Sequence, residues 1–343
     1  MVALLPCGVG FRHGGLDVAD STSVRHIGPT GWLTTPAGTG ILDPASNGGP
    51  ATEAGLETCA TATDPAGNLV IADAGHHQID VVAAKSGTFY GQAMTAGHSY
   101  VVAGNGKLGY APSGVPAKTA KLGGPEVTFD GAGNLVIADS GAGLQDLSRW
   151  ARLQVVAAKS GTFYGQAMTA GDIYTVAGGG TLKGFRANGH PATQAAIGLY
   201  VGQAAVDPHG NLLVAGAHAN RVWLVAAATG TFYGQPMTAG NIYTIAASAG
   251  GPQGVTVDAV GNAVITETDK NQVAVVAARN GTFYGQAMTK GDIYTVAGNG
   301  TAGFSGDGGP ATSAELSLEV GVAVDGQGNL VISGGRRIRR VTG

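Results

Sequence analysis

Charged, aromatic and sulfur-bearing residues are all scarce in this sequence. Only 12% of its 343 residues are charged and 6% are aromatic, and the chain has two cysteines. These cysteines, Cys7 and Cys59, are too few for a disulfide framework, which excludes the small disulfide-stapled folds. Few charges together with 60 glycines are typical of many short strands joined by tight turns, and they argue against a helical protein.

The chain also lacks segments that direct a protein to a membrane or to nucleic acid. No apolar run approaches the roughly 20 residues of a membrane-spanning helix, and residues 1–5 are too short and uncharged for a signal peptide. The net charge is −3, and its one basic run, residues 336–340, is expected to be part of a strand. We therefore expect a cytoplasmic monomer that binds neither nucleic acid nor membrane, although a secreted chain trimmed of its signal would look the same.

Short catalytic motifs are absent too. The sequence contains no nucleophile elbow, phosphate-binding loop, HExxH or CxxC. Any active site must therefore be assembled from residues that lie far apart in the sequence.

Two repeated motifs divide the chain. Gly-Thr-Phe-Tyr-Gly-Gln occurs at 87–92, 161–166, 230–235 and 281–286. Asp-x-x-Gly-Asn, flanked by β-rich runs, begins at Asp64, Asp130, Asp207, Asp258 and Asp325. Because a Gly- and Asn-containing turn between two β-rich runs predicts a hairpin, and two further runs follow, each repeat is expected to form four antiparallel strands, named a to d in chain order.

Six such repeats predict an all-β, six-bladed β-propeller of four-stranded antiparallel blades. The N-terminal repeat is degenerate, with runs at 7–11, 16–20, 24–27 and 32–38, and the last repeat has only three strands. We expect residues 1–5 to supply the missing strand and close the ring, which would remove exposed sheet edges. The expected single domain, 1–343, has blades at about 6–38, 57–104, 124–178, 200–247, 252–298, and 318–343 plus 1–5.

The repeat resembles a known family. The order Gly-Val-Ala-Val-Asp-x-x-Gly-Asn-Leu-x-Ile, best seen in residues 300–341, resembles the NHL repeat. The resemblance covers nearly the whole chain and implies a propeller similar in overall fold to gluconolactonase-like propellers and virginiamycin B lyase. It implies little about activity, because NHL propellers include binding modules, lyases and hydrolases.

The two faces of the expected propeller differ. The Gly-Thr-Phe-Tyr-Gly-Gln copies are nearly identical and are expected to be structural, with Phe and Tyr packing between blades. The loops expected on the opposite face are unequal, and uneven loops on a rigid scaffold are typical of a functional site. Residues expected to face the channel near this side include Cys59, Glu126, Gln203 and Gln253, where ordinary repeat drift is the alternative interpretation.

The b–c loops of the same face add titratable side chains. Histidine can transfer a proton near neutral pH, and a carboxyl group can act as its acid or base partner. The expected catalytic residues are His76, His218, Glu126 and Glu267. The expected substrate-binding residues are Cys59, Gln203, Gln253, Arg149, Trp150 and His77. The aspartates at the strand ends, Asp20, Asp73 and Asp139, are expected to cap loops.

The resemblance also implies a possible cofactor. Gluconolactonase-like propellers and virginiamycin B lyase hold a divalent cation in the channel, and Glu126, Gln203, His218 and Glu267 could imitate that ligand set. Zinc held by Cys7, Cys59 and a histidine is an alternative, as is a purely structural role for both cysteines. No cofactor is certain from the residues.

The sequence leaves two functions open. The first is a small-molecule enzyme with acid–base chemistry of the lyase, cyclase or isomerase type at the top of the channel, in secondary metabolism. The second is a non-catalytic propeller that binds a small ligand or a protein.

Overall fold

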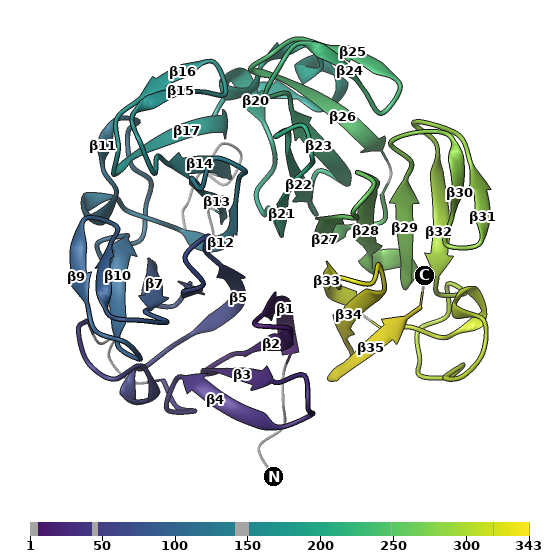
Figure 1. Cartoon of the computed structure of the whole chain (residues 1–343). Coiled ribbons are helices and arrows are strands. Elements are labelled where there is room, and N and C mark those ends of the chain that lie inside the picture. The colour runs from purple at the N-terminus through teal and green to yellow at the C-terminus, as the bar shows by residue number, and fades with distance from the viewer. Residues whose placement is uncertain (1–5, 43–46, 141–150, 248, 318, 343) are drawn as a thin grey trace. The chain divides into compact units, whose positions relative to one another are not determined.

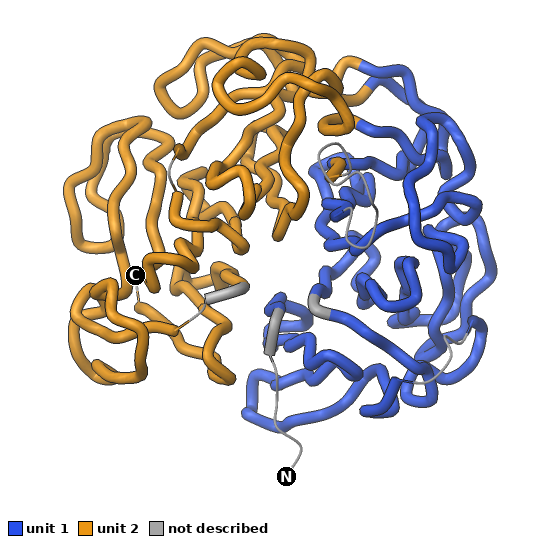
Figure 2. Tube along the Cα trace, turned by 180° about the vertical axis from the view of Figure 1, so that it is seen from behind, with its two compact units in different colours: residues 1–145, 153–162, 166–175 blue, residues 146–152, 163–165, 176–343 orange. Residues whose placement is uncertain are grey.

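The structure is a computed structural model, and it consists of two compact units (Figure 2). The described residues are 6–42, 47–140, 151–247, 249–317 and 319–342. The first unit comprises residues 1–145, 153–162 and 166–175, and the second comprises 146–152, 163–165 and 176–343. Each unit is described by itself below.

The first unit carries antiparallel sheets built from consecutive strands (Figure 1). The first sheet has the order β1 (Pro6–Arg12), β2 (Gly15–Asp20), β3 (Ser23–Ile27), β4 (Leu33–Ala37). The second has β5 (Thr58–Thr63), β6 (Leu69–Asp73), β7 (Gln78–Val82), β10 (Ser99–Ala103). The third has β12 (Gly124–Phe129), β13 (Leu135–Ser140), β14 (Arg152–Val156), β17 (Asp172–Gly178) and β11 (Val115–Pro116). The end of β17 is counted with the second unit.

The second unit continues the same pattern. Its first sheet has β21 (Ala204–Val206), β22 (Leu212–Gly216), β23 (Arg221–Val225), β26 (Asn241–Ala247) and β19 (His190–Pro191). The fifth sheet of the chain has β27 (Pro252–Val257), β28 (Ala263–Glu267), β29 (Gln272–Val276), β32 (Ile293–Ala297). The sixth has three strands among the described residues: β33 (Glu319–Val324), β34 (Leu330–Gly334), β35 (Arg337–Val341).

Short elements connect these sheets. The Gly-Thr-Phe-Tyr-Gly-Gln copies form separate two-stranded hairpins: β8 (Gly87–Phe89) with β9 (Gln92–Met94), β15 (Gly161–Phe163) with β16 (Gln166–Met168), β24 (Gly230–Phe232) with β25 (Gln235–Met237), and β30 (Gly281–Phe283) with β31 (Gln286–Met288). Two-residue strands β18 (Leu182–Lys183) and β20 (Ala195–Ala196) also pair. Single 3₁₀ turns are η1 (Ala51–Glu53), η2 (Ala117–Thr119), η4 (Gly184–Ala187), η5 (Ala192–Gln194), η6 (Thr268–Lys270) and η7 (Ala311–Ser313).

The Asp-x-x-Gly-Asn motif closes the first hairpin of each repeat. In the second sheet, Asp64 Oδ1 accepts hydrogen bonds from the backbone N–H groups of Ala66 (2.9 Å) and Asn68 (2.8 Å). Gly67 adopts φ 85°, a conformation that glycine reaches without strain. Asn68 is fully buried; it donates to Asp64 Oδ2 and accepts from the N–H of Ala84, which follows the third strand. The motif therefore fastens three strands, which explains its spacing.

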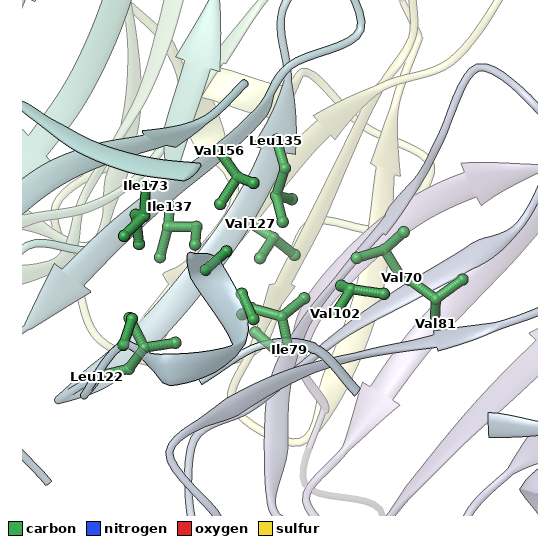
Figure 3. Packing of buried hydrophobic residues seen from close by; sticks show 14 of the residues in the cluster. Val70, Ile79, Val81, Val102, Leu122, Val127, Leu135, Ile137, Val156 and Ile173 are labelled. Carbon is green, nitrogen blue, oxygen red and sulfur yellow. The ribbon is translucent and has the colours of Figure 1, made fainter. Parts of the chain in front are cut away.

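The core lies between neighbouring sheets of each unit. Successive side chains of a strand point to opposite faces of its sheet, so the β-branched and leucine side chains of one strand form two sets. Each set packs against a different neighbouring sheet. Figure 3 shows such a cluster in the first unit, where Ile79 and Val81 of β7 meet Leu122, Val127 and Ile137. In the second unit, equivalent clusters lie between the fourth and fifth sheets and between the fifth and sixth.

These sheets confirm the predicted fold class. Among the described residues the chain is all-β, with six antiparallel sheets of the β-propeller blade type and only single 3₁₀ turns as helix. The degenerate first repeat forms β1 to β4 where it was expected. The predicted closure of the ring falls on residues 1–5, which lie outside the described residues. In the part of the chain that is described, we find no helix with the length and apolarity to span a membrane.

Candidate functional site

An aspartate–histidine pair stands at the end of β6 in the first unit. The strand ends at Asp73, and the turn that follows presents His76 before β7 begins at Gln78. Asp73 is fully buried, and its Oδ1 accepts a hydrogen bond from the Glu57 N–H (2.9 Å). Its Oδ2 lies 2.7 Å from His76 Nδ1, and 21% of the His76 side chain is exposed. The carboxylate thus fixes the imidazole ring at the surface.

This geometry defines a tautomer. In the neutral imidazole whose Nδ1–H donates to Asp73 Oδ2, the lone pair is on Nε2. A histidine oriented in this way by a buried carboxylate is suited to take a proton at Nε2 and to return it. Asp73 also accepts from the backbone of Glu57, 16 residues earlier in the chain, so it holds that segment against the end of β6. Asp139 does the same for Gly123 N–H at 2.7 Å.

A second buried carboxyl group lies behind the pair. Asp80 sits on β7 opposite Ile71 of β6, and only 2% of it is exposed. Burial, followed by the negative charge and hydrogen bonding of the neighbouring Asp73, raises the pKa of Asp80 well above its ordinary range.

His77 connects this turn to the third sheet. Its backbone is left-handed, with φ 54°, and its Nδ1–H donates to the carbonyl oxygen of Gly123 at 2.6 Å. Gly123 directly precedes β12, the strand that carries Glu126. His77 therefore positions the start of β12 relative to the turn, and its predicted contact with substrate stays a prediction.

Glu126 is the second acid–base group of the first unit. It lies on β12 opposite Ala138 of β13 and keeps only part of its surface accessible. Burial raises the pKa of Glu126 to about 8, because the ionised form loses hydration that nothing replaces. At neutral pH the side chain is a carboxylic acid, which can donate a proton. The predicted catalytic residues His76 and Glu126 thus have the properties of a base and an acid.

In the second unit, two predicted site residues share a cavity. His218, in the turn after β22, and Gln253, on β27, line a cavity of about 380 Å³. The edge of the His218 ring packs against Tyr200, with ring centroids 6.2 Å apart and planes at 80°. Cavities of roughly 300–1,000 Å³ are typical of small-molecule sites. The remaining lining residues are Ala217, Gly251 and Asp269.

Gln203 has a structural partner on another sheet. Its Oε1 accepts a hydrogen bond from the Val322 N–H of β33 (3.2 Å), and its own N–H donates to the Gln253 carbonyl (2.8 Å). The side chain passes over Gly254, where an added Cβ would lie 3.0 Å from that oxygen. Glycine at 254 therefore lets one glutamine bridge three sheets of the second unit.

Glu267 is also committed to a neighbour. The residue ends β28, is 3% exposed and accepts a hydrogen bond from Lys270 Nζ at 2.7 Å. Lys270 belongs to η6, so this ion pair ties η6 to the end of β28. The predicted catalytic role of Glu267 remains untested.

Three predicted site residues lie where side chains are not described. Arg149 and Trp150 fall within residues 141–150, outside the described part of the chain, and the side chain of Cys59 also lies outside it. The sequence reasoning missed Asp80 and Tyr200. A signal existed for Asp80, because the same strand position carries Gln154, Trp223 and Ala274 in the next three repeats, so that an acid in a buried strand is unusual there.

The proposed cation ligands do not fit one metal. Gln203 Oε1 already accepts from Val322, and Glu267 already pairs with Lys270. In the described part of the chain, no three His, Cys, Asp or Glu residues are grouped so that they could hold a metal ion. No step of a reaction is therefore assigned to a cation.

Comparisons with known proteins show the fold but no family. No family model and no curated protein matches the chain, so the NHL resemblance stays a prediction. Among solved structures, a gluconolactonase from Xanthomonas campestris has a TM-score of 0.57 at 14% identity, covering 98% of this chain and 86% of that one. Virginiamycin B lyase from Staphylococcus aureus has a TM-score of 0.50 at 11% identity, covering 99% of this chain and 85% of that one. A streptogramin B lyase has a TM-score of 0.51 at 11% identity, covering 99% of this chain and 94% of that one.

These similarities confirm the predicted fold relationship. Each solved structure matches this chain over nearly its full length, so the chain shares their propeller fold. Sequence identities of 11–14% carry no further conclusion about activity. The neighbours themselves are enzymes, a lactonase and two lyases by their descriptions.

Proposed function

We propose that the protein is a small-molecule enzyme that uses acid–base chemistry of the lyase, cyclase or isomerase type. The observation that carries this proposal is the Asp73–His76 pair, with its 2.7 Å contact and its partly exposed imidazole. In this proposal the enzyme acts in secondary metabolism, and its substrate is a small apolar or polycyclic molecule. The enzymatic nature of the neighbours with the same fold supports it.

His76 and Glu126 have complementary roles in the proposed reaction. His76 Nε2 takes a proton from the substrate, and Asp73 stabilises the imidazolium that forms. Glu126, neutral because burial raises its pKa to about 8, donates a proton to the developing negative charge or to a leaving group. A proton balance of this kind needs no redox cofactor.

His76→Ala should lower turnover at least about 100-fold, because a positioned general base contributes roughly 10²–10⁴ to a rate. Initial rates would be measured on gluconolactone, on a panel of other lactones and on streptogramin B, the substrate types suggested by the names of the structural neighbours. His98→Ala is the matched control, since His98 Nδ1–H donates only to the Gly48 carbonyl (2.9 Å). Equal rates for both variants would contradict the proposal.

The second candidate function is non-catalytic ligand binding in the second unit. The cavity of about 380 Å³ beside His218 and Tyr200 favours it, because the cavity joins an aromatic wall to the polar groups of Gln253 and Asp269. A small molecule that raises the melting temperature of the protein should lose most of this effect in His218→Ala. His190→Ala, at an exposed position of β19, is the control. Ligands that stabilise all three proteins equally would exclude this cavity.

A further inference from the structure

The repeated hairpins hold a tyrosine with two different partners. In each copy of Gly-Thr-Phe-Tyr-Gly-Gln the Tyr and the next Gly both have positive φ, for example 50° at Tyr90 and 70° at Gly91. This is the geometry of a type I′ turn, and it places the tyrosine at the tip of the hairpin. The side chain then turns either to its own sheet or to the following one. The sequence of the hairpin does not decide which.

In the second unit, Tyr233 turns to the following sheet. Its hydroxyl donates to the carbonyl oxygen of Gly261 at 2.7 Å, in the Asp-x-x-Gly-Asn turn of the fifth sheet. The residue is 4% exposed and belongs to the core that includes Ala263 and Val276. A phenol ring therefore fills the groove between the fourth and fifth sheets, with its hydroxyl on a backbone carbonyl.

In the first unit, Tyr90 turns to its own sheet. Its hydroxyl donates to Asp64 Oδ2 at 3.0 Å. The groove between the second and third sheets then contains a pocket of about 630 Å³. Among its lining residues are Gly133, Leu135 and Val156, the counterparts in the third sheet of Gly261, Ala263 and Val276. Tyr90 itself also lines this pocket, which we call the Tyr90 pocket.

A connection explains the difference between the two grooves. Before the third sheet, the chain runs through Pro116–Lys118, which line the pocket, and the Ala117 N–H donates to the Gly171 carbonyl at 3.0 Å. Before the fifth sheet, β26 ends at Ala247 and β27 begins at Pro252, so no such segment fits there. Residues 116–118 therefore add a wall beside Tyr90 that has no counterpart in the connection before the fifth sheet.

The chemistry of the Tyr90 pocket is mostly apolar with polar groups at its edge. Val102 comes from the second sheet, and Leu135 and Val156 come from neighbouring strands of the third (Figure 3). Phe89 comes from the hairpin β8–β9. Lys118 also lines the pocket, and its Nζ donates to Gln92 Oε1 at 2.7 Å. Such a lining favours a flat apolar ring that carries one hydrogen-bond donor.

We propose that the Tyr90 pocket binds a small phenolic molecule, whose ring takes the position that Tyr233 occupies in the second unit and whose hydroxyl donates to the Gly133 carbonyl. The two grooves share their backbone turn and strand positions, so the phenol of Tyr233 indicates which chemical group fits the equivalent groove of the first unit. This site lies on different loops from Asp73, His76 and Glu126, and it does not depend on the proposed acid–base chemistry.

The test uses p-cresol, which is the side chain of tyrosine as a free molecule. Titration of the full-length protein, followed by ligand-observed NMR, should show saturable binding with a dissociation constant on the order of 1 mM or lower, as expected for a ligand of this size. Ala66→Trp should weaken binding at least about tenfold by filling the pocket from the exposed rim that Ala66 forms. Because Ala66 contributes only its backbone N–H to the turn, the fold is expected to tolerate the change.

The matched control is His209→Trp. His209 holds the equivalent position of the turn in the fourth sheet, and its N–H likewise donates to an aspartate, Asp207 Oδ1, at 2.8 Å. This variant should bind p-cresol as the wild type does. Tyr233→Ala should gain a second binding site, because it opens the corresponding groove. Absence of saturable binding to the wild type, equal weakening by both tryptophan variants, or one site only in Tyr233→Ala would overturn the proposal.

Discussion

Glu126→Gln should make the protein more stable at pH 8 and leave its stability at pH 5 almost unchanged. Burial raises the pKa of Glu126 from an ordinary value of 4.5 to about 8 in the folded protein. Between these values the folded state keeps a proton that the unfolded state has released. The contribution of Glu126 to stability is therefore full below about pH 4.5 and is lost as the pH rises to about 8.

The size of this effect follows from the pKa difference. One pKa unit corresponds to about 1.4 kcal/mol, so the wild type should lose roughly 3 kcal/mol relative to Glu126→Gln between pH 5 and pH 8. Urea unfolding at both pH values measures the difference. Asp80, whose pKa burial also raises, leaves a residual slope in both proteins. For Glu53→Gln, at an exposed position, the free energy of unfolding should change with pH as it does for the wild type. The same pH dependence in Glu126→Gln would refute the raised pKa of Glu126.

Asn262→Ala should be among the most destabilising single substitutions in the second unit. Asn262 is fully buried, donates to Asp258 Oδ2 and accepts from the Ala278 N–H, both at 2.8 Å. Alanine would leave the Ala278 N–H without this partner, and Asp258 Oδ2 would keep the hydrogen bond from the Tyr284 hydroxyl at 3.1 Å. Since an unsatisfied buried group costs about 1–3 kcal/mol and a hydrogen bond to a charged group contributes about 1.5 kcal/mol or more, we expect a loss of about 3 kcal/mol.

The chain offers a matched control for this change. Asn329 occupies the same motif position in the sixth sheet and donates to Asp325 Oδ2 at 2.8 Å, but it is 7% exposed and its aspartate is only partly buried. Water can therefore replace the lost bonds, and Asn329→Ala should cost about 1 kcal/mol. Melting temperatures and urea midpoints of the two variants would test the ranking. Equal losses would mean that burial does not control the strength of the motif.

The repeats made most of the fold predictable. Regular spacing of Asp-x-x-Gly-Asn marks the first hairpin of each sheet, because only this turn satisfies Asp64 and Asn68 together. Even the degenerate first repeat was identified, because its run Leu-Asp-Val-Ala-Asp at 16–20 matches the Leu-Val-Ile-Ala-Asp of later repeats. The separate hairpins β8–β9 and their relatives were not foreseen. A Tyr-Gly pair with two positive φ values is a turn signal that could have revealed them.

The candidate site was predictable only in part. His76 could be selected as a titratable loop residue, but its bond to Asp73 depends on how the turn after β6 folds back. The raised pKa of Asp80 depends on burial between sheets, which a single strand does not reveal. Gln203 was expected to face substrate, yet its amide oxygen accepts from Val322, 119 residues away in sequence. A local turn decides the first of these, and long-range packing decides the other two.

The buried asparagines have a kinetic consequence. Asn68, Asn211 and Asn262 each bond a backbone N–H only 16 residues further along the chain. Each bond thus forms within one contiguous stretch and pays the entropy of closing a short loop. Folding slows as the mean sequence separation of contacts grows, and β-proteins are generally slow for this reason. Here successive sheets can assemble one after another as the chain leaves the ribosome, before distant partners have been synthesised.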